Sequence, residues 1–164
     1  MRCIIIDMDN CLSDDRWRRA QVFNPRAADF AVGKLLAPFH GYNSLAPFDA
    51  PTTRDAFAQE ILHWDNPAVV ISTARPEFYF TATKEWLSRN FPELQLLNIY
   101  MRNNADDASG VEVKRKSLGR LKLDYSPEIL CAYDDDRDAL DMYADNGIQG
   151  KVVDIAAGIF EATA

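Results

Sequence analysis

Two aspartates, Asp7 and Asp9, stand directly after a short apolar run at residues 3–6. Four consecutive aliphatic or thiol residues without polar alternation are typical of a central parallel strand that is covered on both faces. Asp7 would then lie at the carboxyl end of this strand, and open α/β sheets bind their ligands in the crevice outside such ends. Two anions held this close together require a cation, so the pair predicts a metal site.

Other residues that could take part in chemistry follow further apolar runs along the chain. Thr73 follows the run at 68–71, and Arg102 follows the run at 96–101. Lys114 begins a basic amphipathic segment, and a second acid pair, Asp134 and Asp135, follows the run at 129–133. Parallel strands joined by helical crossovers bring their carboxyl ends to one rim, so we expect these side chains to converge.

The types of these side chains indicate phosphoryl transfer. A carboxylate such as Asp7 can attack phosphorus and form an aspartyl phosphate, which water then hydrolyses. Asp9 is placed to protonate the leaving oxygen and later to activate the water. Thr73 and Lys114 would hold the remaining phosphoryl oxygens, and the lysine would neutralise the charge that develops during transfer.

The predicted metal is Mg²⁺, because it prefers oxygen ligands, keeps several waters and typically takes one or two carboxylates plus a substrate phosphate. Asp7 and Asp135 are the main candidate ligands. Asp9, through its backbone carbonyl, and Asp134 complete the candidate set. A helix-loop-helix calcium loop counted from Asp7 is excluded, because its required glycine and closing glutamate fall on Leu12 and Arg18.

Each element of this site also has a structural interpretation that the residues leave open. Thr73 could cap a helix, since threonine is common at that position. Lys114 lies beside Arg115 and Lys116, and such a run is usually a solvated face. The acids at 134–138 could be favourable charges at a helix start. The order of acid pair, hydroxyl, lysine and acid pair favours one site over four separate coincidences.

Apolar runs and helix signals predict the elements that position these residues. Strands are expected at 3–6, 68–71, 96–101, 129–133 and 151–154, with helical segments between them. Ser13 is expected to cap a helix, and Pro76 to begin one. The fold class is therefore α/β, a three-layer Rossmann-like arrangement with a central parallel sheet of about five strands. We expect a single domain, 1–164, with a small helical cap insertion at about 24–66.

Composition limits the partners and the compartment. The length of 164 residues with 48% hydrophobic side chains suits one packed core, and no apolar run could span a bilayer. Three scattered cysteines, without a signal peptide, indicate a cytoplasmic protein with reduced thiols. The net charge of -7 disfavours a long grip on nucleic acid, so at most a short contact with a strand end is expected. Oligomeric state is left open.

The order of these motifs resembles the haloacid dehalogenase superfamily of phosphohydrolases. The Asp-x-Asp motif of that superfamily matches Asp7-Met8-Asp9, and its Ser or Thr motif matches Thr73. Its lysine matches Lys114, and its acidic motif matches Asp134-Asp135. The resemblance spans most of the chain and implies a magnesium-dependent phosphatase with this fold.

Within the superfamily, the chain is most similar to the phosphatase domain of polynucleotide kinase phosphatases. Thr73-Ala74-Arg75 matches their Thr/Ser-Gly-Arg, and Tyr100-Met101-Arg102 matches a segment that precedes a Gly-Asp loop. The resemblance implies a nucleotide or a polynucleotide 3'-phosphate end as substrate. The residues expected to bind it are Arg18, Thr73, Ala74, Arg75, Arg102 and Lys114.

The chain departs from that pattern at two places that bear on the substrate. Asn10-Cys11 replaces the usual Gly-Thr; asparagine tolerates positive φ, so the turn can form, but Cys11 removes a hydroxyl. The Arg and the Asp that usually stand between the Met-Arg segment and the lysine in those phosphatases are replaced here by Ala108 and Gly110. A phosphatase or phosphotransferase for another small metabolite, and a phosphate-binding signalling module, are the alternatives. Receiver domains place their phospho-acceptor after the third strand, where this chain has Met101-Arg102.

Overall fold

The computed structural model describes residues 1–23, 42–52, 54–156 and 159–162. Its main sheet has six strands in the order β5-β4-β1-β6-β7-β8, and the first five are parallel. These strands are β1 (Arg2–Ile6), β4 (Ala68–Pro76), β5 (Leu96–Arg102), β6 (Glu128–Asp134), β7 (Gly150–Asp154) and β8 (Ile159–Ala162). The main helices are α1 (Arg16–Phe23), α4 (Arg54–His63), α5 (Phe80–Asn90), α6 (Gly110–Tyr125) and α7 (Arg137–Asp145).

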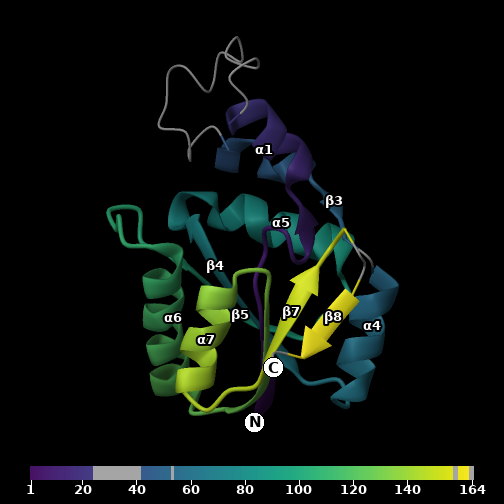
Figure 1. The fold of residues 1–164 in the computed structure, drawn as a ribbon, viewed down its shortest axis with the longest axis vertical. Coiled ribbons are helices and arrows are strands. Elements are labelled where there is room, and N and C mark those ends of the chain that lie inside the picture. The colour runs from purple at the N-terminus through teal and green to yellow at the C-terminus, as the bar shows by residue number, and fades with distance from the viewer. Residues whose placement is uncertain (24–41, 53, 157–158, 163–164) are drawn as a thin grey trace.

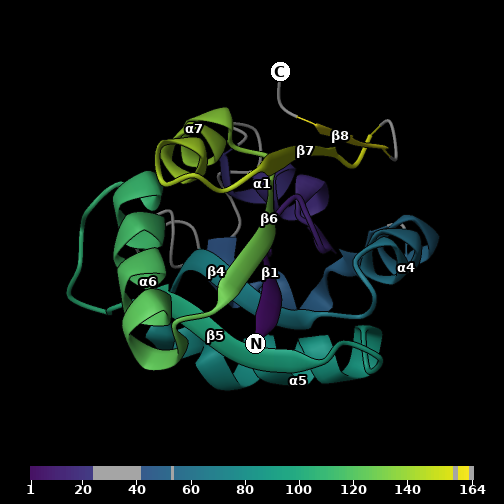
Figure 2. The ribbon, with the colours of Figure 1, turned by 90° about the horizontal axis from the view of Figure 1, so that it is seen from below.

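The sheet is the middle layer of three. Helices α6 and α7 cover one face, and α4 and α5 cover the other (Figure 2). Strand β1 supplies both cores, because alternate side chains of a strand point to opposite faces. Ile4 and Ile6 pack in the cluster that contains Phe57 of α4 and Trp86 of α5, whereas Ile5 packs with Leu118 of α6. The predicted three-layer α/β fold with a parallel sheet is therefore confirmed.

Strand register brings the predicted site residues to one edge. Ile6 of β1 pairs with Ile71 of β4 on one side and with Tyr133 of β6 on the other. The Asp7 N–H continues this pairing by donating to the Tyr133 carbonyl at 3.0 Å. Asp7 therefore lies one residue beyond the last residue that β1 pairs with its two neighbouring strands, at the carboxyl end of β1.

A tight turn and a strand of a small two-stranded sheet follow Asp7, where a capped helix start was predicted. Ser13 belongs to β2 (Ser13–Asp14), which pairs antiparallel with β3 (Ala50–Pro51). The Ser13 hydroxyl donates to the Met8 carbonyl at 3.2 Å and so stabilises the turn. Helix α1 begins later, and the Asp14 carboxylate accepts the N–H of Arg16 at 3.1 Å. Ser13 is therefore not a helix cap.

The described parts of the segment predicted as a cap insertion lie in two places, above the edge of the sheet and against its face. Residues 24–41 lie outside the described part of the chain. Helix α1 and the short 3₁₀ helix η2 (Ala46–Phe48) lie above the carboxyl edge of the sheet (Figure 1). Helix α4 instead packs against the sheet, with Phe57 and Ile61 buried in the core. Burial of this apolar face thus makes α4 part of a sheet layer, and the extent of the cap insertion stays a prediction.

Two further differences concern strand ends. Pro76 ends β4 in extended backbone, φ -62° and ψ 147°, and precedes the 3₁₀ helix η3 (Glu77–Tyr79) instead of beginning a helix itself. Proline accommodates this geometry because its ring fixes only φ. Strand β8, antiparallel to β7, was not predicted. Among the described residues, no helix has both the length and the apolar character needed to cross a membrane.

Candidate active site

Asp7, Lys114 and Asp134 form a buried charge cluster at the carboxyl edge of the sheet. The Lys114 Nζ lies 2.6 Å from Asp134 Oδ2 and 3.4 Å from Asp7 Oδ1. Burial alone would lower the pKa of Lys114, but the Asp7 and Asp134 carboxylates outweigh it and raise this pKa. Lys114 is 5% exposed, so the alternative of a solvated surface lysine is excluded.

Helix α6 positions this lysine. The Ser109 hydroxyl caps the helix by accepting the Glu112 N–H at 3.3 Å, as expected for a serine before an acidic first turn. Lys114 follows within two turns, on the side of α6 that also buries Val113 and Leu118. The cap and the buried apolar face thus direct a long cationic side chain toward Asp7.

Asp134 holds the lysine. One of its carboxylate oxygens accepts from Lys114, and the other accepts the Asp136 N–H at 3.0 Å. Of the predicted metal ligands, Asp7 and Asp135 face one another; metal ligation by Asp134 stays a prediction. Ligating oxygens of Asp7 and Asp135 and the Cys11 sulfur all lie within 4.8 Å of one another.

Asn10 connects the first turn to this second acid pair. It has the predicted positive φ, 61°, and its side-chain amide donates to Asp135 Oδ2 at 2.7 Å. Burial raises the pKa of Asp135 to about 6; the Asn10 hydrogen bond opposes this shift, and the neighbouring Asp134 adds to it. The sequence predicted only a turn at Asn10, because a contact across 125 residues leaves no local signal.

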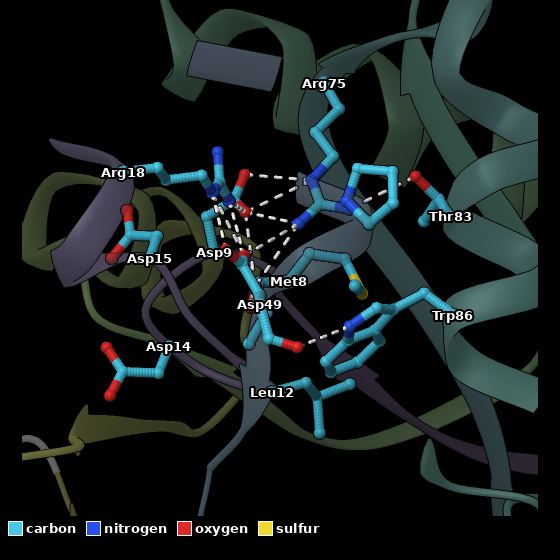
Figure 3. A network of polar contacts seen from close by, with 12 residues as sticks. Met8, Asp9, Leu12, Asp14, Asp15, Arg18, Asp49, Arg75, Thr83 and Trp86 are labelled. Atoms are coloured by element: carbon cyan, nitrogen blue, oxygen red, sulfur yellow. Dashed lines mark hydrogen bonds and ion pairs between the residues drawn. The ribbon is translucent and has the colours of Figure 1, made fainter. Parts of the chain in front are cut away.

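Asp9 is held by two arginines (Figure 3). Its carboxylate accepts from Nη2 of Arg18 and from Nη2 and Nε of Arg75, with both Nε contacts at 3.1 Å. Burial alone would raise the pKa of Asp9, but Arg75 and then Arg18 outweigh it and hold this pKa well below its usual range. Asp9 is therefore ionised in this arrangement, whereas a proton donor must carry a proton.

The same network continues to Asp49, which the sequence analysis missed. Arg18 donates to both Asp49 oxygens, at 2.9 and 3.0 Å, and Trp17 Nε1 donates to one of them at 2.8 Å. Two carboxylates thus balance two guanidinium groups, so the cluster of Asp9, Asp49, Arg18 and Arg75 carries no net charge. Asp49 stands within the segment predicted as a cap insertion, without any periodic pattern to mark it.

The predicted substrate-binding residues divide between the site edge and the interior. Arg18 is fully buried and Arg75 is 3% exposed, both within the network of Asp9. Arg102 donates to the backbone carbonyls of Ala74, at 2.9 Å, and of Asp106, at 3.1 Å. Arg102 therefore connects the end of β4 with the loop that follows β5, and its contact with a substrate stays a prediction.

Thr73 does not cap a helix. It lies within β4, is 1% exposed, and its hydroxyl accepts the Arg75 N–H at 3.3 Å. Three residues, 74–76, separate it from the start of η3, so the capping alternative is excluded. The hydroxyl instead stabilises the irregular end of β4, from which Arg75 reaches Asp9.

The remaining donor atoms fit a divalent cation. Asp7 and Asp135 offer carboxylate oxygens, the ligands that Mg²⁺ prefers, from two different strand ends. Burial and the nearby carboxylates of Asp134 and Asp135 raise the pKa of Asp7, while Lys114 opposes the shift. A cation between these carboxylates would relieve the repulsion that raises this pKa.

Neither a protein-family model nor a curated protein sequence matches this chain. Solved structures do match. A chain of the Pnkp1/Rnl/Hen1 RNA repair complex is 18% identical, with a TM-score of 0.60 over 88% of this chain and 39% of that one. A second structure of that complex gives a TM-score of 0.66 at 18% identity, over 93% and 45% of the two chains. This chain thus spans less than half the length of those relatives.

Two bacterial structures match over most of both chains. The haloacid dehalogenase-like hydrolase SP0104 from Streptococcus pneumoniae is 14% identical, with a TM-score of 0.59 over 90% of this chain and 82% of that one. CbbY from Rhodobacter sphaeroides, solved with phosphate, is 15% identical, with a TM-score of 0.57 over 90% and 84%. The fold that the motifs led us to expect is thereby confirmed: the chain has the fold of the haloacid dehalogenase-like hydrolases.

Proposed function

We propose that this protein is a magnesium-dependent phosphomonoesterase that acts through an aspartyl phosphate on a nucleotide or a polynucleotide 3'-phosphate end. One observation carries the proposal. A buried carboxylate, Asp7, lies at the carboxyl end of the central strand with a charged lysine 3.4 Å away and a second carboxylate facing it. The fold, shared with hydrolases of the haloacid dehalogenase-like type, supports the same reaction class.

In the proposed reaction, a carboxylate oxygen of Asp7 attacks phosphorus and the bond to the leaving oxygen breaks. The leaving alkoxide takes a proton, and water then attacks the aspartyl phosphate to release inorganic phosphate and restore Asp7. Lys114 balances negative charge on the transferring group from its fixed position. Mg²⁺ held by Asp7 and Asp135 would supply further charge neutralisation.

Asp9 is the proposed proton donor and, in the second half-reaction, the proposed base. Its two arginine partners hold it ionised, which suits the base role directly. The donor role requires Asp9 to exchange at least one arginine contact when an anionic phosphate enters, because the same guanidinium groups also bind phosphate oxygens well. We therefore assign Arg75, whose Nη2 and Nε both contact Asp9, as the arginine that turns toward the phosphate.

The proposed substrate class rests on motif resemblance and on fold. Thr73-Ala74-Arg75 and Tyr100-Met101-Arg102 resemble segments of the polynucleotide kinase phosphatases. A chain of an RNA repair complex is among the structures of the same fold. The net charge of -7 favours a small nucleotide or a strand end over a long polynucleotide.

The decisive experiment is magnesium-dependent hydrolysis of a generic aryl phosphate by the protein and by its Asp7→Asn variant. We expect the variant to lose turnover to background, because an amide cannot form the aspartyl phosphate. Asp141→Asn is the matched control, since Asp141 is an exposed aspartate of α7. Undiminished turnover by Asp7→Asn would refute the assigned nucleophile.

A second experiment narrows the substrate. Phosphate release is measured over 5' and 3' nucleoside monophosphates, a 3'-phosphorylated oligonucleotide and non-nucleotide phosphate esters. We expect the highest kcat/KM among the nucleotide compounds. A clear preference for a sugar phosphate, or transfer of the phosphoryl group to an added alcohol faster than to water, would replace this substrate assignment with a metabolite phosphatase or a phosphotransferase.

A further inference from the structure

Cys11 lies among the candidate metal ligands but takes no part in the proposed reaction. Its sulfur lies within 4.8 Å of ligating oxygens of both Asp7 and Asp135. The side chain is fully buried, and its thiol has no hydrogen-bond partner in the part of the chain that the structure describes. The buried thiol therefore faces two carboxylates, and no hydrogen bond within the described part of the chain accounts for its orientation.

The backbone fixes this thiol in place. The Cys11 N–H donates to the Met8 carbonyl at 3.3 Å, and the Cys11 carbonyl accepts from the Thr52 hydroxyl. Asn10, the preceding residue, adopts φ 61° and binds Asp135 through its side chain. The turn is thus held on both sides, so the sulfur does not depend on a mobile loop for its position.

One sulfur and two carboxylates make a donor set different from the one Mg²⁺ prefers. Mg²⁺ takes oxygen ligands, whereas thiolate ligands select softer ions such as Zn²⁺ and Cd²⁺. Zn²⁺ is commonly bound by three protein ligands drawn from cysteine, histidine and carboxylates, with water in the fourth position. The described part of the chain offers three such ligands here, from the turn after β1 and from the end of β6.

We propose that Asp7, Cys11 and Asp135 form a binding site for a thiophilic divalent cation, Zn²⁺, in competition with Mg²⁺. The thiol proton passes to solvent as the metal–sulfur bond forms, with no change of oxidation state. Zn²⁺ bound in this way occupies the Asp7 carboxylate, so it inhibits turnover. This inhibitory consequence rests on the proposed function, whereas the binding itself does not.

Binding is tested by adding Cd²⁺ to the metal-free protein and recording the ultraviolet charge-transfer absorption of a cadmium–thiolate bond. We expect one equivalent of Cd²⁺ to produce the band in the protein and no band in Cys11→Thr or Cys11→Ser. Cys3→Ala is the matched control, because Cys3 is also fully buried but lies in the opposite core cluster and should leave the band intact. Urea unfolding of each variant establishes that it is folded.

Zn²⁺ affinity is measured with a chromophoric chelator as competitor. Loss of an outer partner of a metal ligand costs about 10- to 100-fold in affinity, so removal of a direct ligand should weaken Zn²⁺ binding at least as much. Mg²⁺ affinity should be unaffected by Cys11→Thr. Absence of the band at stoichiometric Cd²⁺, or an unchanged band in folded Cys11→Thr, would overturn the proposed site.

Activity assays distinguish failure of the proposed metal site from failure of the proposed phosphatase function. If the protein hydrolyses phosphate esters, the Zn²⁺ concentration that halves the rate should rise by about tenfold or more in Cys11→Thr. A cadmium–thiolate band in a protein without phosphatase activity would retain the metal site and refute the phosphatase. Phosphatase activity without the cadmium–thiolate band would refute the metal site and retain the phosphatase.

Discussion

Lys114 is the residue whose surroundings bear most directly on the proposed chemistry. A primary ammonium group lies between Asp7 and Asp134 in a site almost closed to water. Its own burial is unfavourable, and the two carboxylates compensate for it. The effect is mutual, because burial raises the pKa of both carboxylates and Lys114 opposes that rise at each of them.

Replacing this cation should therefore impair both activity and stability. For Lys114→Met we expect kcat/KM on an aryl phosphate to fall by about 100-fold or more, since a fixed group of this kind contributes about 3 to 4 kcal/mol at a transition state. Leaving buried carboxylates without their partner should also cost about 3 to 5 kcal/mol of unfolding free energy. Urea denaturation measures the second effect.

Lys116→Met is the control on the same helix. The Lys116 side chain is 58% exposed and pairs with Asp106 at the surface, at 2.6 Å. Exposed pairs contribute little, about 0 to 1 kcal/mol, so this variant should keep its activity and nearly all of its stability. Equal losses in the two variants would show that Lys114 has no special position.

Site residues marked by a local sequence pattern could be predicted, whereas contacts between residues far apart in the sequence could not. Asp7, Lys114 and Asp135 could be predicted because each lies beside a strong local signal, a strand end or a helix start. The partners of Asp9 could not, since neither Arg18 nor Arg75 reveals in sequence that it turns inward. Asp49 and Cys11 became visible only when the chain was folded, because their contacts join turns that carry no periodic pattern.

At the scale of elements, one buried carboxylate connects α1 with the segment that carries η2 and β3. Asp49 binds Arg18 and Trp17 of α1 through its side chain, and its carbonyl accepts from Trp86 of α5 at 2.9 Å. The two-stranded sheet of β2 and β3 adds backbone contacts to this connection. Within the described part of the chain, a charged contact between Arg18 and Asp49 thus attaches α1 over the sheet edge.

Asp49→Ala should loosen this attachment. It leaves Arg18 fully buried with Asp9 as its remaining anionic partner, a loss that costs about 3 to 5 kcal/mol in comparable buried pairs. Urea denaturation followed by tryptophan fluorescence reports it directly, because Trp17 and Trp86 both contact Asp49. Arg16→Ala, at the exposed pair of Arg16 with Asp14, should change stability by less than about 1 kcal/mol. A stable Asp49→Ala protein would contradict the proposed attachment.

Strand β5 and helix α6 share a contact whose strength depends on pH. The Tyr100 hydroxyl donates to Asp124 at 2.7 Å, and burial together with this bond raises the pKa of Tyr100 to about 12. An unfolded tyrosine loses its proton near its ordinary value of 10. Between these two values the unfolded chain holds fewer protons than the folded one, so stability falls as pH rises through the window.

The comparison variant for this effect is Tyr100→Phe. Urea midpoints measured from pH 9 upward should decline in both proteins, because other buried tyrosines titrate there as well. The urea midpoint of Tyr100→Phe, taken relative to its own value at pH 9, should decline less than that of the unsubstituted protein. A decline of equal size would show that the Tyr100 hydroxyl does not contribute.

The elements themselves were largely predictable, for a reason visible in β1 and β4. Both are continuous apolar runs that end in polar residues, and that pattern depends only on burial of both faces. Strand β8 follows no such run, and its pairing with β7 in antiparallel direction reverses the chain after a short connection. Helix α4 was predicted as a helix, but its place against the sheet could not be predicted, because an apolar face does not specify which surface covers it.

For the whole molecule, charge is distributed so that the cations of the site are already neutralised. Arg18, Arg75 and Lys114 each contact a carboxylate, and the chain as a whole carries -7. A strand of nucleic acid would therefore gain cationic contacts only for its phosphorylated end, in exchange for these carboxylates, and would meet repulsion along the rest. The affinity of such a strand should come from its terminal nucleotides.

This distribution predicts how turnover depends on strand length and salt. For 3'-phosphorylated DNA, kcat/KM should not rise once the strand exceeds a few nucleotides, because further phosphates gain no cationic contact. Its salt dependence should be shallow, since the logarithmic slope is about 0.7 per contacted phosphate for single strands. Steady-state kinetics on strands of increasing length, each at several salt concentrations, measure both. A steady gain with length and a steep slope would require a basic track along the surface, which the net charge of the chain argues against.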